Sequence, residues 1–162
     1  VAVLAPNALQ VLRMFDSGKR RRFDPKYLIG NAFQKLLARK MIEFVDTPRG
    51  RFVRLTEDGK RKLTGMIARA PDSRKHKRWD KRWRVVIYDI KEKRKVTRNK
   101  LQRTLLNFGF RKLQNSVWVY PYDCEELIFL LKADFKIGTE VLYMVVEKVE
   151  NDVMLRKCFG IK

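Results

Sequence analysis

Asp89 is the residue whose type and position most directly suggest chemistry. It follows the strand-like run WRVVIY, residues 83–88, and precedes a basic segment. A carboxylate at the end of a buried strand can bind Mg²⁺, which needs few protein ligands and activates water for attack on a phosphodiester. The alternative is structural, with Asp89 capping a helix that begins near Lys91. We favour the cap, because one carboxylate per chain supplies no separate general base.

The cysteines and the histidine do not form the pattern of a zinc site. Cys124 and Cys158 have no CxxC spacing, and His76 is the single histidine. A structural zinc ion takes about four such ligands, in closely spaced pairs. We therefore expect a reducing, cytoplasmic setting and no cofactor, apart from Mg²⁺ if the chain is a nuclease.

Positive charge is concentrated in the first two thirds of the chain. The 162 residues carry a formal net charge of +20, to which residues 104–162 contribute nothing. A small domain needs a net charge of only about 2–8 for solubility. The excess therefore predicts a polyanionic partner, double-stranded DNA. The apolar runs have the length of strands and the N-terminus lacks a basic n-region, so we expect neither a membrane span nor a signal peptide.

Residues 1–68 show the pattern of a small DNA-binding domain. Apolar residues at helical spacing, with a break near Gly30, come before two alternating strands that flank a Pro/Gly loop. Thr56 is the expected N-cap of a further helix. The predicted elements are helices over 7–17 and 24–40 and strands over 42–45 and 52–55. This order resembles a winged-helix domain, most specifically in LLARKMIEF and LTEDGK.

The winged-helix resemblance implies which residues contact DNA. In such domains the helix before the hairpin lies in the major groove, and the hairpin tip reaches the backbone or the minor groove. Asn and Gln can read adenine, while Arg and Lys can read guanine or contact phosphate. The candidates implied here are Asn31, Gln34, Lys35 and Arg39 on the helix, Arg49 and Arg51 at the hairpin tip, and the run Arg20, Arg21 and Arg22. An ordinary polar helix face, or a protein-binding winged helix, remains the alternative.

Residues 69–82 are predicted to be a basic, solvated linker, because no apolar periodicity appears before Trp83. The linker either lies along DNA phosphates or is a simple tether. Trp79 is expected to pack on the second domain, since an exposed tryptophan leaves a large apolar surface in water. The candidate phosphate contacts are Arg74, Lys75, Lys77 and Arg78.

Residues 83–162 predict a ferredoxin-like domain of β-α-β-β-α-β order with a C-terminal helix, so the fold class is α+β. Alternation marks the strands, and spacing of three to four marks the helices. The predicted strands are 83–90, 110–113, 116–120 and 140–147, and the predicted helices are 91–108, 123–131 and 151–159. Arg94 and Arg98 on the first of these helices are further candidate DNA contacts, and Asp123 is the expected cap of the second.

The phrases VVIYDI and GFRKLQNSVWVYPYD carry a family resemblance. They are similar to the CRISPR-associated Cas-two fold, and more similar to the Cas-two-like central domain of PaaX-type transcriptional repressors. A winged helix in front of this domain also resembles the PaaX arrangement. In Cas-two nucleases the aspartate at the end of the first strand is the proposed metal ligand, shared across a two-fold dimer, and here that residue is Asp89.

Two functions follow as hypotheses. The first is a dimeric, sequence-specific, repressor-like DNA-binding regulator, not an enzyme, with the Cas-two-like domain forming the homodimer. The second is a Mg²⁺-dependent Cas-two-like endonuclease, or a non-catalytic scaffold in CRISPR adaptation. Trp118 and Tyr120 share one face of their strand, where packing or self-association is favoured over base stacking.

Overall fold

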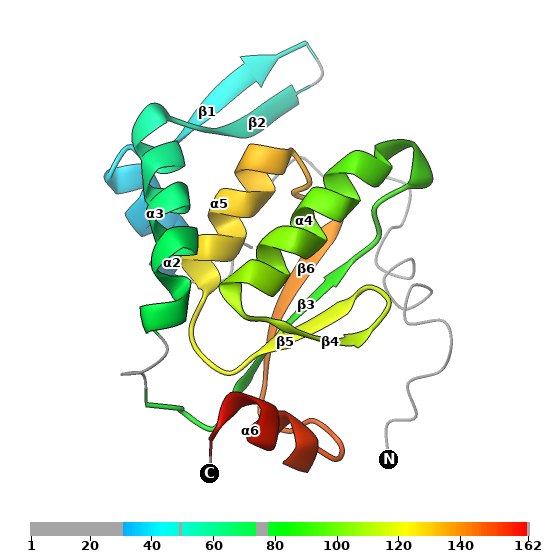
Figure 1. Ribbon diagram of the computed structural model, residues 1–162. Helices are drawn as coiled ribbons and strands as arrows, with labels where there is room; N and C mark the ends of the chain where they lie inside the picture. The colour runs from blue at the N-terminus through cyan, green and yellow to red at the C-terminus, as the bar shows by residue number, and fades with distance from the viewer. Residues whose placement is uncertain (1–30, 49, 74–77, 162) are drawn as a thin grey trace.

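The computed structural model describes residues 31–48, 50–73 and 78–161. The first part, residues 31–73, contains a helix, a two-stranded hairpin and a longer helix (Figure 1). These elements are α2 (Asn31–Ala38), β1 (Ile42–Thr47), β2 (Gly50–Leu55) and α3 (Glu57–Ser73). The predicted helix over 7–17 and the start of the next one lie outside the described residues. The hairpin predicted between residues 42 and 55 is confirmed, with Phe44 opposite Val53.

The second part, residues 78–161, is a four-stranded antiparallel sheet with helices on its faces. Its strands are ordered β4-β5-β3-β6, and along the chain they follow the predicted β-α-β-β-α-β order. The elements are β3 (Trp83–Tyr88), the 3₁₀ turn η3 (Glu92–Arg94), α4 (Lys95–Phe108), β4 (Arg111–Gln114), β5 (Val117–Tyr120), α5 (Glu125–Phe135), β6 (Val141–Val146) and α6 (Val153–Phe159).

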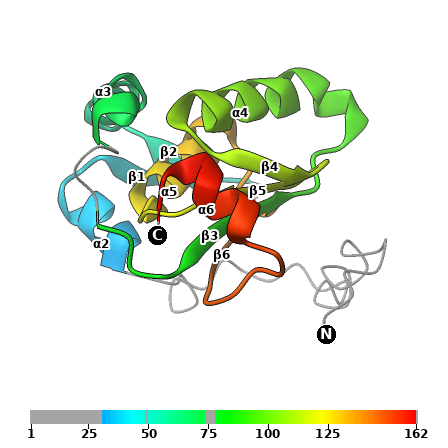
Figure 2. The ribbon, with the colours of Figure 1, turned by 60° about the horizontal axis from the view of Figure 1, so that its bottom comes forward.

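The alternation of β3 divides its side chains between the two faces of the sheet. Val86 and Tyr88 lie in the core beneath α4 and α5, whereas Trp83 and Val85 form a second cluster that α6 partly covers. Figure 2 shows α4 above β4 and β5, and α6 in front of the end of the sheet. Leu101, Leu105 and Phe108 are the buried face of α4, as their spacing predicts.

The two parts share one hydrophobic core. The Phe33 ring on α2 lies 6.0 Å from the Phe44 ring on β1 and 5.8 Å from the Phe129 ring on α5. Helices α2 and α3 and strand β2 all contact α5, which therefore lies between the first part and the sheet (Figure 1). Buried residues of both parts, Leu36 and Leu63 among them, belong to the same cluster as the sheet core.

Helix α3 begins as the sequence predicts but ends later. The Thr56 hydroxyl accepts a hydrogen bond from the backbone N–H of Gly59 at 3.1 Å, which confirms Thr56 as the N-cap. The helix then continues to Ser73, into the segment predicted to be a linker. Apolar contacts of Leu63 and Met66 with the shared core hold the helix along the second part.

Gly59 stands where α3 meets the turn after α2. A Cβ atom at this position would overlap the Met41 carbonyl oxygen and lie 3.1 Å from Leu55 Cδ2. The Met41 carbonyl cannot move away freely, because it accepts a hydrogen bond from the Thr56 N–H at 3.1 Å. The close approach of the two backbones leaves no room for a side chain, so this position requires glycine despite its low helix propensity.

Gly59→Ala is expected to lower the free energy of unfolding by about 2 kcal/mol, since overpacking displaces a hydrogen-bonded carbonyl. Gly65, in the same helix, is the matched control because a Cβ there meets nothing within 4 Å. Gly65→Ala is expected to raise the free energy of unfolding by about 0.5–1 kcal/mol through helix propensity alone. Urea denaturation measures both values, and equal effects of the two substitutions would contradict the close approach.

Candidate nucleic-acid interface

Helix α2 presents the candidate DNA-reading residues that the structure describes. Ala32, Phe33 and Leu36 are buried, while Gln34 and Lys35 are exposed on the other side. The helix contains no Asp or Glu. It ends where Lys40 adopts a φ of 54° and the Met41 N–H donates to the Leu36 carbonyl at 2.9 Å. Asn31 is the first residue of the helix, and Arg20, Arg21 and Arg22 lie outside the described residues.

The beginning of α5 places two carboxylates beside α2. Glu126 lies 3.8 Å from the Arg39 guanidinium and 3.4 Å from the Lys62 ammonium, both measured from its carboxylate oxygens. Burial of the Glu125 carboxyl raises its pKa, Asp123 adds to this effect, and the charge of Lys35 opposes it. Arg39 is therefore partly neutralised, and Gln34 and Lys35 are the more accessible pair.

The hairpin pairs its basic side chains with acids. Arg51 donates to both carboxylate oxygens of Asp46, at 2.8 and 3.3 Å, and its guanidinium lies 5.6 Å from the centre of the Phe44 ring. The hydrogen bond from Arg51 lowers the pKa of Asp46. Arg54, on the outer face, donates to Glu43 at 2.7 Å. The winged-helix resemblance implies that Arg51 contacts DNA at the hairpin tip, and the cross-strand register places Asp46 directly opposite it. Arg49 lies outside the described residues.

Arg94 and Arg98 are turned toward the protein, contrary to the expectation that they contact DNA. Arg94 donates to the Phe135 carbonyl at 2.7 Å and to the Lys136 carbonyl at 3.2 Å, and it pairs with Glu140. It thereby satisfies carbonyls at the C-terminal end of α5. Arg98 pairs with Glu92 at 2.8 Å. Both arginines hold α4 in place, so they are poorer DNA contacts than the sequence predicts.

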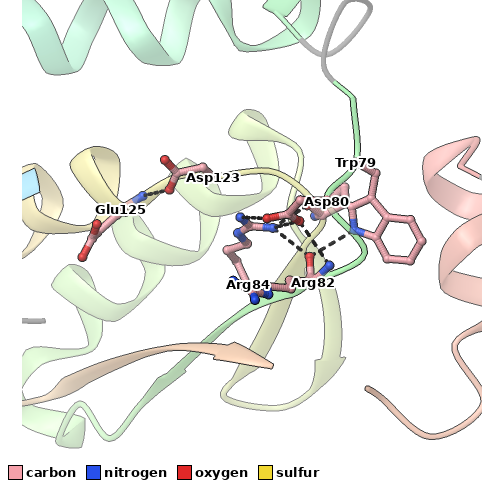
Figure 3. A network of polar contacts seen from close by, with 7 residues as sticks. Trp79, Asp80, Arg82, Arg84, Asp123 and Glu125 are labelled. Atoms are coloured by element: carbon pink, nitrogen blue, oxygen red, sulfur yellow. Dashed lines mark hydrogen bonds and ion pairs between the residues drawn. The ribbon is translucent and has the colours of Figure 1, made fainter. Parts of the chain in front are cut away.

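The segment before β3 is fixed by a buried arginine (Figure 3). Arg84 is 7% exposed and donates to both oxygens of Asp80, at 2.5 and 2.7 Å. It also donates to the carbonyls of Arg82 and Pro121, at 2.8 and 3.0 Å. The hydrogen bond from Arg84 lowers the pKa of Asp80. This end of the predicted linker is therefore ordered, because it satisfies a buried guanidinium.

Trp79 packs on the second part, as the sequence predicts. Its ring lies 5.1 Å from that of Trp83, its indole N–H donates to the Arg82 carbonyl at 3.0 Å, and the Arg156 guanidinium lies 4.9 Å from its ring centre. Among the predicted linker cations, Arg78 is exposed, while Arg74, Lys75 and Lys77 lie outside the described residues.

The comparison with protein families matches this second part. Residues 76–154 match the model of the PaaX protein central Cas2-like domain. The match supports a relationship of this chain to the PaaX-type family. The sheet and helices described above are consistent with a Cas2-like domain. A search of the curated proteins found no match. No helix in the described residues is long and apolar enough to cross a lipid bilayer.

In the Cas2-like domain, Asp89 is not a helix cap. Its side chain is exposed, and its backbone N–H donates to the Glu140 carbonyl at 2.8 Å. The helical segment starts with the 3₁₀ turn after Lys91, and α4 proper starts after Arg94, neither with a side-chain cap. The extended Lys91 carries the chain beyond the reach of Asp89, so the predicted cap is wrong. Asp123, the predicted cap of α5, lies one residue before the N-cap Cys124, and its carboxylate accepts a hydrogen bond from the Glu125 N–H at 3.1 Å (Figure 3).

No cluster of metal-ligating side chains surrounds Asp89 in the part of the chain that the structure describes. Among residues 31–48, 50–73 and 78–161, no group of three or more His, Cys, Asp or Glu is placed to hold a metal ion. Asp89 is therefore a single exposed carboxylate, and a Mg²⁺ ion there would need further ligands from water or from a second copy of the chain.

The aromatic strand β5 of the Cas2-like domain is used for packing. Trp118 and Tyr120 face the helices and are 4% and 0% exposed, while Val119 lies on the other face. The Trp118 indole donates to the Tyr88 hydroxyl at 3.3 Å, and Gln102 donates to the same oxygen at 2.7 Å. The predicted sharing of one face by Trp118 and Tyr120 is confirmed, and neither ring is accessible for stacking on a base.

Proposed function

We propose that the chain is a sequence-specific DNA-binding transcriptional regulator of PaaX type, with a winged-helix first part that reads DNA. The observation that carries this proposal is the exposure of Gln34 and Lys35 on an acid-free helix directly before a β-hairpin. The match of residues 76–154 to the central domain of PaaX proteins supports the regulatory role.

The residue types on α2 suit base reading in the major groove. A glutamine can bond adenine through two hydrogen bonds, and a lysine can donate to guanine or to a phosphate. Gln34 and Lys35 are adjacent, so their side chains project from the helix about 100° apart. One can reach a base edge while the other reaches the flanking DNA backbone. Glu126 partly neutralises Arg39, which follows the helix, and so leaves Gln34 and Lys35 as the favoured contacts.

A homodimer through the Cas2-like domain completes the proposal. On the sheet face opposite α4, Trp83 and Val85 are buried, whereas Ile87, Val117 and Met144 are only partly covered. A second copy on this apolar face would bury these side chains in an isologous interface. Two DNA-reading helices related by a two-fold axis would then bind two half-sites of a palindrome. A monomeric mass in solution would contradict the dimer.

Gln34→Ala is expected to weaken binding to a duplex site selected from random sequences by about 5-fold to 150-fold, the cost of about 1–3 kcal/mol for one lost bidentate base contact. Binding to unrelated duplex DNA is expected to stay the same, because a neutral side chain releases no counterion. Fluorescence anisotropy with both duplexes measures the two affinities.

The matched control is Gln114→Ala, which removes an exposed glutamine from the edge strand β4. It is expected to leave both affinities unchanged. If Gln34→Ala weakens both duplexes equally, or if random selection yields no preferred site, sequence-specific reading by α2 is excluded.

A further inference from the structure

The outward face of α4 carries basic residues that the DNA-reading helix does not account for. From Lys91 to Phe108 the chain has seven Lys or Arg and one acidic residue, Glu92. Two of the seven, Arg94 and Arg98, bond to the protein as described above. We define the α4 basic face as the five that are exposed: Lys91, Lys93, Lys95, Lys100 and Arg103.

Most of this positive charge has no counter-ion. Glu92 is shared between Arg98 at 2.8 Å and Lys95 at 3.7 Å, and Lys100 lies 3.9 Å from Asp134. Lys91, Lys93 and Arg103 have no ion pair with any described residue of the chain. The exposed surface of a helix usually mixes both signs of charge, whereas α4 itself contains no acidic residue.

The position of these lysines opposes a purely structural role. Lys91, Lys93 and Lys95 lie at the N-terminal end of α4, where the helix dipole disfavours positive charge by about 0.3–1 kcal/mol for each residue near the first turn. Stability alone would place acidic residues at this end. A bound polyanion would reverse the penalty, since it would neutralise both the lysines and the positive helix end.

We propose that the α4 basic face binds the phosphate backbone of duplex DNA, as a second contact in addition to α2. This inference rests on the proposed DNA-binding function. Lys95 and Arg103 are eight residues apart, or about 12 Å along the helix at about 1.5 Å per residue. Duplex DNA presents about one negative charge per 1.7 Å of its axis with both strands counted, so a duplex segment of this length carries about seven phosphates, about half of them on each strand. Asn99 and Asn107, which are also exposed, add neutral donors on the same helix.

Because the two parts share one core, the binding free energy of the α4 contact is expected to add to that of the α2 contact. Helix α5 contacts α2, α3 and α4, and α3 also contacts α4, so the α4 basic face and the reading helix belong to one packed body (Figure 1). A DNA molecule that reaches both surfaces therefore binds without the entropic cost of ordering a linker between them. Phosphate contacts position the protein without reading sequence, so the α4 basic face contributes affinity and not discrimination.

The test is the double variant Lys93→Gln, Arg103→Gln, compared with the control double variant Lys148→Gln, Lys157→Gln. All four side chains are exposed, and each pair removes two positive charges. Lys148 and Lys157 belong to the segment around α6, which packs on the cluster of Trp83 and Val85 and lies apart from α4 (Figure 2). The same melting temperature in both variants verifies the fold.

The α4 double variant is expected to reduce the slope of log Kobs against log salt concentration by about 1.8, and to weaken binding about 10-fold to 30-fold at 0.15 M salt. The loss is expected to be the same for the selected site and for unrelated duplex DNA. The control double variant is expected to change the slope by far less. Binding to single-stranded RNA is measured in parallel. If both double variants change the salt slope equally, or if the α4 double variant weakens binding to single-stranded RNA but not to duplex DNA, the α4 basic face does not bind duplex DNA.

The result separates the two proposals. Gln34→Ala changes the preference among sequences, whereas the α4 double variant changes the salt slope at constant preference. If the α4 double variant reduces the salt slope but the wild-type protein prefers no sequence, the result would support the α4 contact and contradict sequence-specific regulation. A preferred site with an unchanged slope would contradict the α4 contact alone.

Discussion

Phe33→Ala is expected to lower the free energy of unfolding of the whole chain by about 3–5 kcal/mol. The Phe33 side chain is 2% exposed and lies between Phe44 of the hairpin and Phe129 of α5. Its removal leaves a cavity at the contact between the two parts, and the surrounding rings can fill that cavity only partly. Urea denaturation followed by tryptophan fluorescence measures the change.

Tryptophan fluorescence shows whether the two parts of the chain unfold together. The three tryptophans, Trp79, Trp83 and Trp118, all lie in the second part, whereas Phe33 lies in the first. If the parts unfold as one unit, the fluorescence midpoint moves with the Phe33 substitution. If they were independent domains joined by a tether, the tryptophan midpoint would not change. Phe52→Ala, which removes a 51% exposed ring from the same hairpin, is the control and is expected to shift the free energy by no more than about 0.5 kcal/mol.

The elements of the second part could be predicted because their signals are local. Alternation in WRVVIY, helical spacing of Leu101, Leu105 and Phe108, and turn residues between β4 and β5 each act over a few residues. The strand order then follows from the β-α-β-β-α-β pattern and the short connections. The contact between the two parts is different, since nothing near Phe33 or Phe129 in the sequence indicates that their rings meet.

The boundary of α3 shows how a local signal can mislead. Ala70-Pro71-Asp72-Ser73 and the basic residues that follow are typical of a linker, because proline and short polar residues favour turns. The helix nevertheless continues to Ser73. Packing of α3 on α4 and α5 supplies stability that a count of helix formers does not include.

Residue type alone does not show which of the basic side chains on a predicted helix face solvent. Arg94 and Arg103 look alike in the sequence, yet Arg94 bonds to carbonyls at the end of α5 while Arg103 is exposed. The partners of Arg94 lie 41, 42 and 46 positions away, so only the folded chain brings them together. Likewise, the pairing of Arg51 with Asp46 depends on the register of the hairpin.

Arg84→Met is expected to lower the free energy of unfolding by about 2–4 kcal/mol. The guanidinium is almost fully buried and makes hydrogen bonds to Asp80, Arg82 and Pro121. Methionine fills the volume of the aliphatic stem, but it leaves the Pro121 carbonyl without this donor and Asp80 without its cation. We place the loss below that for a fully buried ion pair, since the Asp80 side chain is 47% exposed and water can solvate it. Arg82→Met, at an exposed side chain of the same segment, is the control and is expected to have an effect within about 0.5 kcal/mol.

The pH dependence separates the ion pair from the packing of the arginine stem. The hydrogen bond from Arg84 lowers the pKa of Asp80 below its ordinary value of 3.8 in the folded protein. A carboxyl group of this kind contributes stability above its unfolded pKa, and the contribution is lost as the pH falls through the folded pKa. The difference in unfolding free energy between wild type and Arg84→Met is therefore expected to be constant from pH 7 to about pH 5 and to narrow below about pH 4. Urea denaturation at pH 7 and pH 3 measures both values, and a difference that does not narrow would assign the stability to the carbonyl contacts and the buried stem of Arg84.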